Sequence, residues 1–179
     1  MPEEKVRARP AARLRLGVSA CLLGEAVRWD GGHKRDALLV ETLGPRVEWV
    51  PVCPEVELGL GVPRPPIRLE GDARAPRLVV AATGEDLTGR MRRFAEARLE
   101  ALARLDLDGY VLKRASPSCG PGDVPVHGAM GGAGAGVFAT ALRARFPDLP
   151  IEDEGRLADP DVRTRFLDRV AARSRRHRV

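Results

Sequence analysis

Residues 14–20, LRLGVSA, form a short apolar stretch that ends directly before Cys21. Residues 47–52, VEWVPV, repeat the pattern and end directly before Cys53. Short apolar runs of this kind, bounded by turn residues, are typical of buried strands in a parallel sheet. In open parallel sheets, ligands bind beyond the carboxyl ends of the strands. We therefore expect both cysteines at the same edge of one sheet.

The rest of the chain alternates between strand and helix signals. Further strands are expected at residues 77–82, 109–113 and 149–152, and helices at about 37–44, 88–105, 135–146 and 160–174. Asp36 and Thr88 are the expected N-caps of the first two helices. This alternation predicts an α/β fold: a single domain with a mostly parallel sheet and helices on both faces, in a Rossmann-like three-layer arrangement.

Two long segments rich in Gly and Pro, residues 54–71 and 114–136, are expected to be ordered loops. Loops this long inside one domain are usually functional or disordered. The second segment contains Cys119 and follows the strand expected at residues 109–113, so this cysteine is placed at the same edge as the other two. The sequence thus predicts one site that contains all three cysteines.

Composition and charge describe the whole chain. Its 179 residues fit one domain, with 44% apolar and 31% charged residues and a net charge of +5. Residues 1–15 carry +3 and residues 169–179 carry +5, so the residues between them carry −3. We expect a basic N-terminal extension over residues 1–13, one domain over 14–174 and a basic tail over 175–179. The acidic body argues against a nucleic-acid partner.

No apolar run is long enough to cross a bilayer, and the N-terminus lacks the apolar region of a secretory signal. A cytoplasmic protein with no membrane partner is therefore expected. Structural disulfides are rare in a reducing compartment, which leaves inert thiols, a nucleophile or metal ligands as roles for the three cysteines.

Three thiolates suit zinc, copper(I) or an iron–sulfur cluster, and they leave one coordination position open. A three-cysteine zinc hydrolase is one interpretation of this pattern. Another is a non-catalytic module that binds a small anion or nucleotide, in which the cysteines are incidental. These alternatives remain open at this point.

Three long blocks surround the cysteines: VSACLLGEAVRWDGGHKRD (residues 18–36), PVCPEVELGLGVPRPPIRLEG (residues 51–71) and LKRASPSCG (residues 112–120). They resemble the signature blocks of the thiouracil desulfidase family. The stretch Gly136-Val137-Phe138 also matches, and the resemblance covers residues 14 to about 150. Trp29 stands where a Tyr is expected in many members.

The resemblance implies a 4Fe-4S cluster bound by Cys21, Cys53 and Cys119, with one iron left open. The implied reaction is the non-redox removal of sulfur from a small-molecule thiolated pyrimidine, such as 2-thiouracil, to give uracil and hydrogen sulfide. Glu55 and Ser116 match positions implicated in catalysis. Glu55 would position or deprotonate a water molecule, and Ser116 would hydrogen-bond the base or relay a proton. We expect a monomer or a weak dimer.

Further polar or flexible residues near the cysteines are candidates for substrate contact: Ser19, Asp30, His33, Lys34, Arg64, Lys113, Ser118 and Gly134. Solvation of a loop would also explain the polar residues 30–35. Arg64 is a candidate for binding an anion. The Gly-rich residues 128–136 are expected to form either a lid over the substrate or a linker, and they lack the Gly-Lys-Ser/Thr ending of a phosphate-binding loop.

Overall fold

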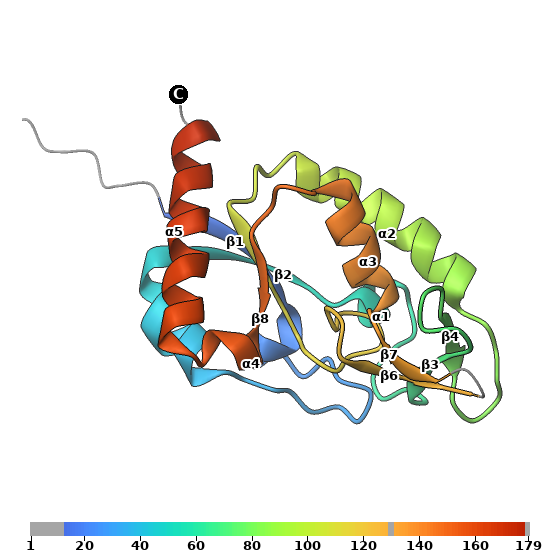
Figure 1. The fold of residues 1–179 in the computed structure, drawn as a ribbon. Coiled ribbons are helices and arrows are strands. Elements are labelled where there is room, and N and C mark those ends of the chain that lie inside the picture. The colour runs from blue at the N-terminus through green and yellow to red at the C-terminus, as the bar shows by residue number, and fades with distance from the viewer. Residues whose placement is uncertain (1–12, 129–130, 178–179) are drawn as a thin grey trace, which may run out of the picture.

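The computed structural model describes residues 13–128 and 131–177 (Figure 1). The expected N-terminal extension lies outside the described residues except for Arg13, and so do residues 129–130 of the Gly-rich stretch. The last helix runs to His177, so the first part of the expected basic tail is helical. No helix in the described part of the chain combines the length and apolar character that a membrane span requires.

The main sheet has four strands: β1 (Leu14–Ser19), β2 (Val47–Val52), β5 (Gly109–Leu112) and β8 (Ile151–Asp153). Their order is β2-β1-β5-β8, and every pairing is parallel. These strands match four of the apolar runs in the sequence. The α/β class and the parallel sheet are therefore confirmed.

A second, smaller sheet lies beside the main one (Figure 1). Its strands, in the order β4-β3-β6-β7, are β4 (Arg77–Val80), β3 (Ile67–Glu70), β6 (Val124–His127) and β7 (Gly132–Gly134). Strand β4 is the run expected at 77–82, but the other three fall within segments expected to be loops. That expectation was wrong for these residues, because pairing with distant strands supplies the backbone hydrogen bonds that their Gly- and Pro-rich sequences do not predict.

Helices connect and cover the strands. They are α1 (Pro54–Glu57), α2 (Thr88–Ala103), α3 (Val137–Arg145), α4 (Glu154–Leu157) and α5 (Pro160–His177), with 3-10 turns η1 (Ala20–Leu23) and η3 (Gly44–Arg46) and a π-helix η2 (Leu38–Leu43). Asp36 caps η2 as expected, since its carboxylate accepts a hydrogen bond from the Leu39 N–H. Thr88 is not a cap: its Oγ1 accepts from the Leu78 N–H, and Asp86 accepts from the Thr88 N–H instead.

Two apolar cores form on opposite faces of the main sheet. One face packs against α2 and α3, and it includes Tyr110 and Leu112. The other packs against α5 and η2, and it includes Leu16 and Val111. Figure 1 shows the helices on the two sides of the sheet. Gly17 makes this packing possible, because a Cβ there would lie 2.2 Å from the Tyr110 ring.

Candidate active site

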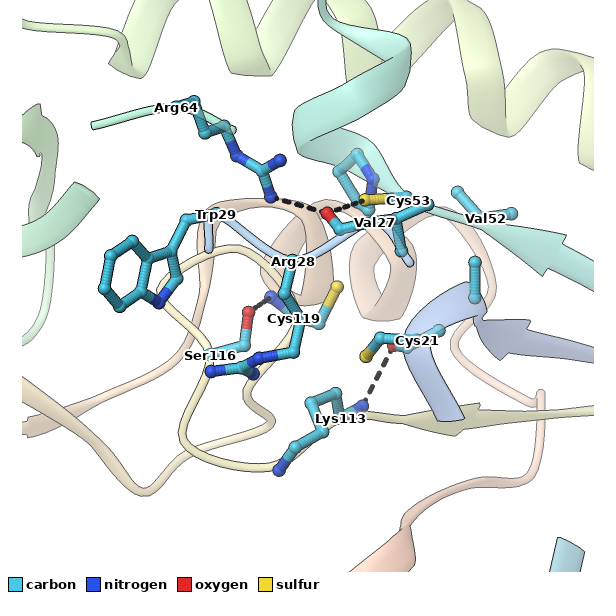
Figure 2. A pocket seen from close by; sticks show the side chains of 13 residues that line it. Cys21, Val27, Arg28, Trp29, Val52, Cys53, Arg64, Lys113, Ser116 and Cys119 are labelled. Carbon is cyan, nitrogen blue, oxygen red and sulfur yellow. Dashed lines mark hydrogen bonds between the residues drawn. The ribbon is translucent and has the colours of Figure 1, made fainter. Parts of the chain in front are cut away.

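Three cysteines from separate segments line one cavity at the carboxyl edge of the main sheet. Cys21 lies in η1 directly after β1, Cys53 lies between β2 and α1, and Cys119 lies in the loop that follows β5. The cavity has a volume of about 70 Å³, and the three side chains converge on it (Figure 2). All three are free thiols. The structure therefore brings together the residues that the strand ends predict.

Burial governs the protonation of these thiols. It raises the pKa of Cys21 to about 11, and the neighbouring Cys53 adds to the shift. Burial also raises the pKa of Cys53 and of Cys119, although a hydrogen bond from Ser19 partly offsets the shift at Cys119. Without a bound metal the side chains are neutral thiols at pH 7. Binding of a metal centre would displace their protons.

The donor set fits an iron–sulfur cluster or another soft metal centre. Sulfur ligands suit soft metals, and the cavity supplies three of them. Among the described residues, no group of three His, Cys, Asp or Glu side chains is arranged to hold one metal ion.

Glu55, in the first turn of α1, has both carboxylate oxygens engaged. Its Oε2 accepts from Arg64 Nε at 2.9 Å and lies 2.7 Å from Arg64 Nη2. Its Oε1 accepts from the Ser118 hydroxyl at 2.8 Å. Ser118 itself is completely buried and lies in the Cys119 loop. One carboxylate thus connects the segment after Cys53 to the loop that carries Cys119.

Arg64 is buried and uses its guanidinium group within the protein. Nη1 donates to the Gly61 carbonyl and Nη2 to the Val27 carbonyl, each at 2.9 Å. The same Val27 oxygen lies 3.8 Å from the Cys53 sulfur, which donates to it. Arg64 lines the cavity, but its donors are directed to Glu55 and these carbonyls rather than presented to an anion.

Ser116 shapes the loop around Cys119. Its Oγ accepts from the N–H groups of Ser118 and Cys119, at 3.3 and 3.1 Å. Gly136, at the start of α3, supports the loop from behind by donating to the Gly120 carbonyl at 2.8 Å. A Cβ on Gly136 would lie 2.4 Å from the Ser118 carbonyl, so only glycine fits this contact.

Lys113 and Ser19 lie at the ends of neighbouring strands. Ser19 Oγ accepts from the Lys113 N–H at 2.9 Å. The Lys113 ammonium donates to Glu154 and lies near Cys21, whose pKa it lowers against the effect of burial. The chain has only three lysines against many arginines, and two of them, Lys34 and Lys113, line the site.

A second cavity of about 310 Å³ adjoins the first. The two share four lining residues: Arg28, Trp29, Lys113 and Ser116. Glu55 and Lys34 line only the second cavity, whereas Ser116 lines both the inner cavity with its cysteines and this outer cavity with its several cationic residues. This arrangement provides room for a small molecule whose one end reaches the cysteines.

Three candidates lie away from both cavities. Asp30 accepts from the Gly32 N–H, and His33 Nδ1 accepts from the Arg35 N–H, both within an exposed loop. Gly134 lies in β7, where a Cβ would contact Val126 and the backbone of Ala73. The structure does not bring these three residues to the cysteines.

Comparison with known proteins adds the decisive observation. The family model described as 2-thiouracil desulfurase matches residues 16–154 of this chain. The chain belongs to the 2-thiouracil desulfurase family. It is therefore an enzyme of the desulfidase type, and the family match spans all three cysteines, Glu55 and Ser116.

Two individual proteins are similar to this desulfurase family member. The chain is similar to YbbK of Bacillus subtilis strain 168, an uncharacterised protein, with 31% identity over 134 residues that span 70% of this chain and 87% of the relative. Among solved structures it is similar to the 4Fe-4S-dependent thiouracil desulfidase TudS. That match has a TM-score of 0.65 and 33% identity, and it covers 85% of this chain and 97% of the other.

Sequence reasoning did not select several residues that complete the site of this desulfurase. Val27 provides the carbonyl shared by Arg64 and Cys53, and Glu57 accepts from the Cys53 N–H at 3.1 Å. Glu154 holds Lys113. Arg28 and Trp29 line both cavities. For Trp29 the sequence offered one signal: it is one of only two tryptophans, and it lies in a polar loop.

Proposed function

We propose that this chain removes sulfur from a thiolated pyrimidine such as 2-thiouracil, with water as the second reactant and uracil and hydrogen sulfide as products. A 4Fe-4S cluster held by Cys21, Cys53 and Cys119 is part of the proposal. The single observation that carries it is the convergence of three thiols, two of them buried, on one cavity next to a fixed carboxylate. The 4Fe-4S dependence of TudS supports it.

The cluster would supply a Lewis acid, since three protein ligands leave one iron open to the thiocarbonyl sulfur. The remaining chemistry belongs to the chain. Oε2 of Glu55 already accepts two contacts from Arg64, whereas Oε1 accepts one hydrogen bond and keeps one acceptor position. Oε1 is therefore the atom that would take a proton from the attacking water.

Ser116 is suited to donate rather than accept. Both acceptor positions of its Oγ are used by backbone N–H groups of the Cys119 loop. Its hydroxyl hydrogen stays available for the ring nitrogen or oxygen of the substrate. This division assigns proton acceptance to Glu55 and hydrogen-bond donation to Ser116.

A zinc hydrolase is the second candidate, and the geometry favours it less. The described residues include no group arranged for one metal ion. In a binding module with incidental cysteines, replacing them would leave ligand affinity intact. The shared cavity makes incidental cysteines a poor explanation.

The test is sulfide release from 2-thiouracil by enzyme reconstituted under anaerobic conditions. We expect equal amounts of sulfide and uracil from the wild type and neither product from the Cys21→Ser, Cys53→Ser or Cys119→Ser variants. Lack of release from any thiolated pyrimidine by the cluster-loaded wild type would overturn the proposal.

A further inference from the structure

Aromatic side chains are scarce in this chain, and one of them is placed unlike the rest. The sequence has two Trp, one Tyr and four Phe. Six of these pack in or against the two cores: Trp49, Phe94, Tyr110, Phe138, Phe146 and Phe166. Trp29 belongs to neither core and leaves 44% of its surface exposed. An exposed indole in so aromatic-poor a chain calls for an explanation other than packing.

Trp29 lies where the inner and outer cavities meet. It lines both of them, as do Ser116 and Arg28. Figure 2 shows the indole at the edge of the cysteine pocket, beside Ser116. Among the described residues, no other aromatic side chain lines either cavity. The indole is therefore the single aromatic face among the described residues that line the site.

The backbone that carries Trp29 is fixed rather than loose. Its carbonyl accepts from the Arg64 N–H at 2.9 Å. The preceding Arg28 donates its N–H to the Gly32 carbonyl at 3.1 Å and accepts from the Gly31 N–H at 2.9 Å, which closes a turn. Arg64 also holds Glu55, so one buried residue sets the positions of both the indole and the carboxylate.

We propose that the indole of Trp29 is the platform on which the pyrimidine ring of the substrate stacks. The inference rests on the proposed function and specifies how the base is held. A planar heteroaromatic ring gains stability on an aromatic face whatever its substituents. A ring stacked at the junction directs one edge toward the cysteines and the other toward the cationic outer cavity. Trp29 thus fixes the orientation of the thiocarbonyl group.

Fluorescence tests the stacking without turnover, because the chain has only two tryptophans. In the Trp49→Phe variant all tryptophan emission comes from Trp29, and in Trp29→Phe it comes from the core residue. The full chain is titrated with uracil, uridine and uridine monophosphate, which carry the ring without sulfur and separate a free base from a nucleoside and a nucleotide. We expect saturable quenching by at least one of them in Trp49→Phe and none in Trp29→Phe. Unchanged Trp29 emission with all three would overturn the proposal.

Kinetics of the cluster-loaded enzyme provide the second readout. Trp29→Ala should raise KM roughly tenfold or more while kcat changes little, and Trp29→Phe should fall between it and the wild type. Val62→Ala is the matched control, since Val62 is similarly exposed at 42% near the same loop but lines neither cavity. An unchanged KM in Trp29→Ala would overturn the stacking while leaving desulfidation intact. Absence of sulfide release by the wild type would instead refute the proposed function, and the fluorescence would still decide the stacking.

Discussion

Two charged segments follow neighbouring strands of the main sheet, and they fold in opposite ways. After β2, Arg64 and Glu55 form an ion pair whose side chains are only 4% and 13% exposed. After β1, Arg35 and Glu41 form an ion pair whose side chains are 40% and 64% exposed. A buried charge is tolerated only when it is paired and hydrogen-bonded. Burial, rather than the presence of charge, therefore distinguishes the first pair, whose members line the two cavities, from the second pair, whose members line neither.

Other residues of the two segments repeat this contrast. Glu55 reaches Ser118, which is 63 positions away in the sequence, and so joins two cysteine loops. Asp30 and His33 accept hydrogen bonds from backbone N–H groups two residues away, and the further ion pair of Asp30 is with Arg28, also two residues away. The long-range contact of Glu55 fixes the relative positions of two cysteine loops, whereas the local contacts of Asp30 and His33 only shape a turn.

The largest effect is expected at Glu55. Glu55→Gln keeps the shape and most hydrogen bonds but removes the proton acceptor, so kcat should fall by about 10²- to 10⁴-fold. Iron content should stay at the wild-type level, which separates the chemistry from assembly of the site. Glu41→Gln is the control and should keep full activity. If Glu55→Gln kept its activity within tenfold of the wild type, Glu55 would not be the general base.

The second largest effect is expected at Arg64, on the stability of the protein. Arg64→Leu leaves Glu55 buried without its partner and should lower the free energy of unfolding by about 3–5 kcal/mol. The same change at the exposed pair, Arg35→Leu, should cost less than about 1 kcal/mol. Urea unfolding of the two variants measures the difference. Equal costs would mean that burial does not distinguish the two pairs.

Gly136 offers a steric test of the Cys119 loop. Gly136→Ala places a Cβ 2.4 Å from the Ser118 carbonyl, and the backbone must shift to accommodate it. We expect a loss of about 1–3 kcal/mol in stability together with a lower iron content after reconstitution. Gly122→Ala in the same segment meets open space and serves as the control. Similar iron contents in the two variants would remove Gly136 from the support of the site.

The smallest effects are expected in the exposed loop. Asp30→Ala and His33→Ala should change the free energy of unfolding by no more than about 0.5 kcal/mol. Since neither residue lines a cavity, KM for the thiolated base should stay within about twofold of the wild type. A large rise in KM for either variant would show that this loop contacts the substrate.

The main sheet could be predicted because each of its strands is a local apolar run, and Cys21 and Cys53 directly follow two of them. The second sheet could not. Strands β6 and β7, VPVH and GAG, have weak local strand preference, and they form only because distant strands supply partners. The extent of the predicted loops was therefore wrong, although Arg64 from the first segment and Cys119 from the second do line the inner cavity.

The site shows the same difference between features set by local sequence and features set by long-range contacts. Position at strand ends placed the cysteines correctly, and the family resemblance pointed to Glu55 and Ser116. The sequence did not show that Arg64 binds Glu55 rather than an anion, since that contact depends on how residues 58–66 fold back on the Cys21 loop. Trp29 was visible only as a departure from an expected Tyr, and its place between two cavities required the structure.

Metal analysis is the decisive experiment for a cluster held by three converging cysteines. Iron, zinc and acid-labile sulfide are measured per chain after anaerobic reconstitution of the wild type and of each Cys→Ser variant. We expect about four irons and four sulfides per wild-type chain, and a marked loss of both iron and sulfide in all three variants. One zinc and no iron in the wild type, or full iron retention in any single variant, would contradict it.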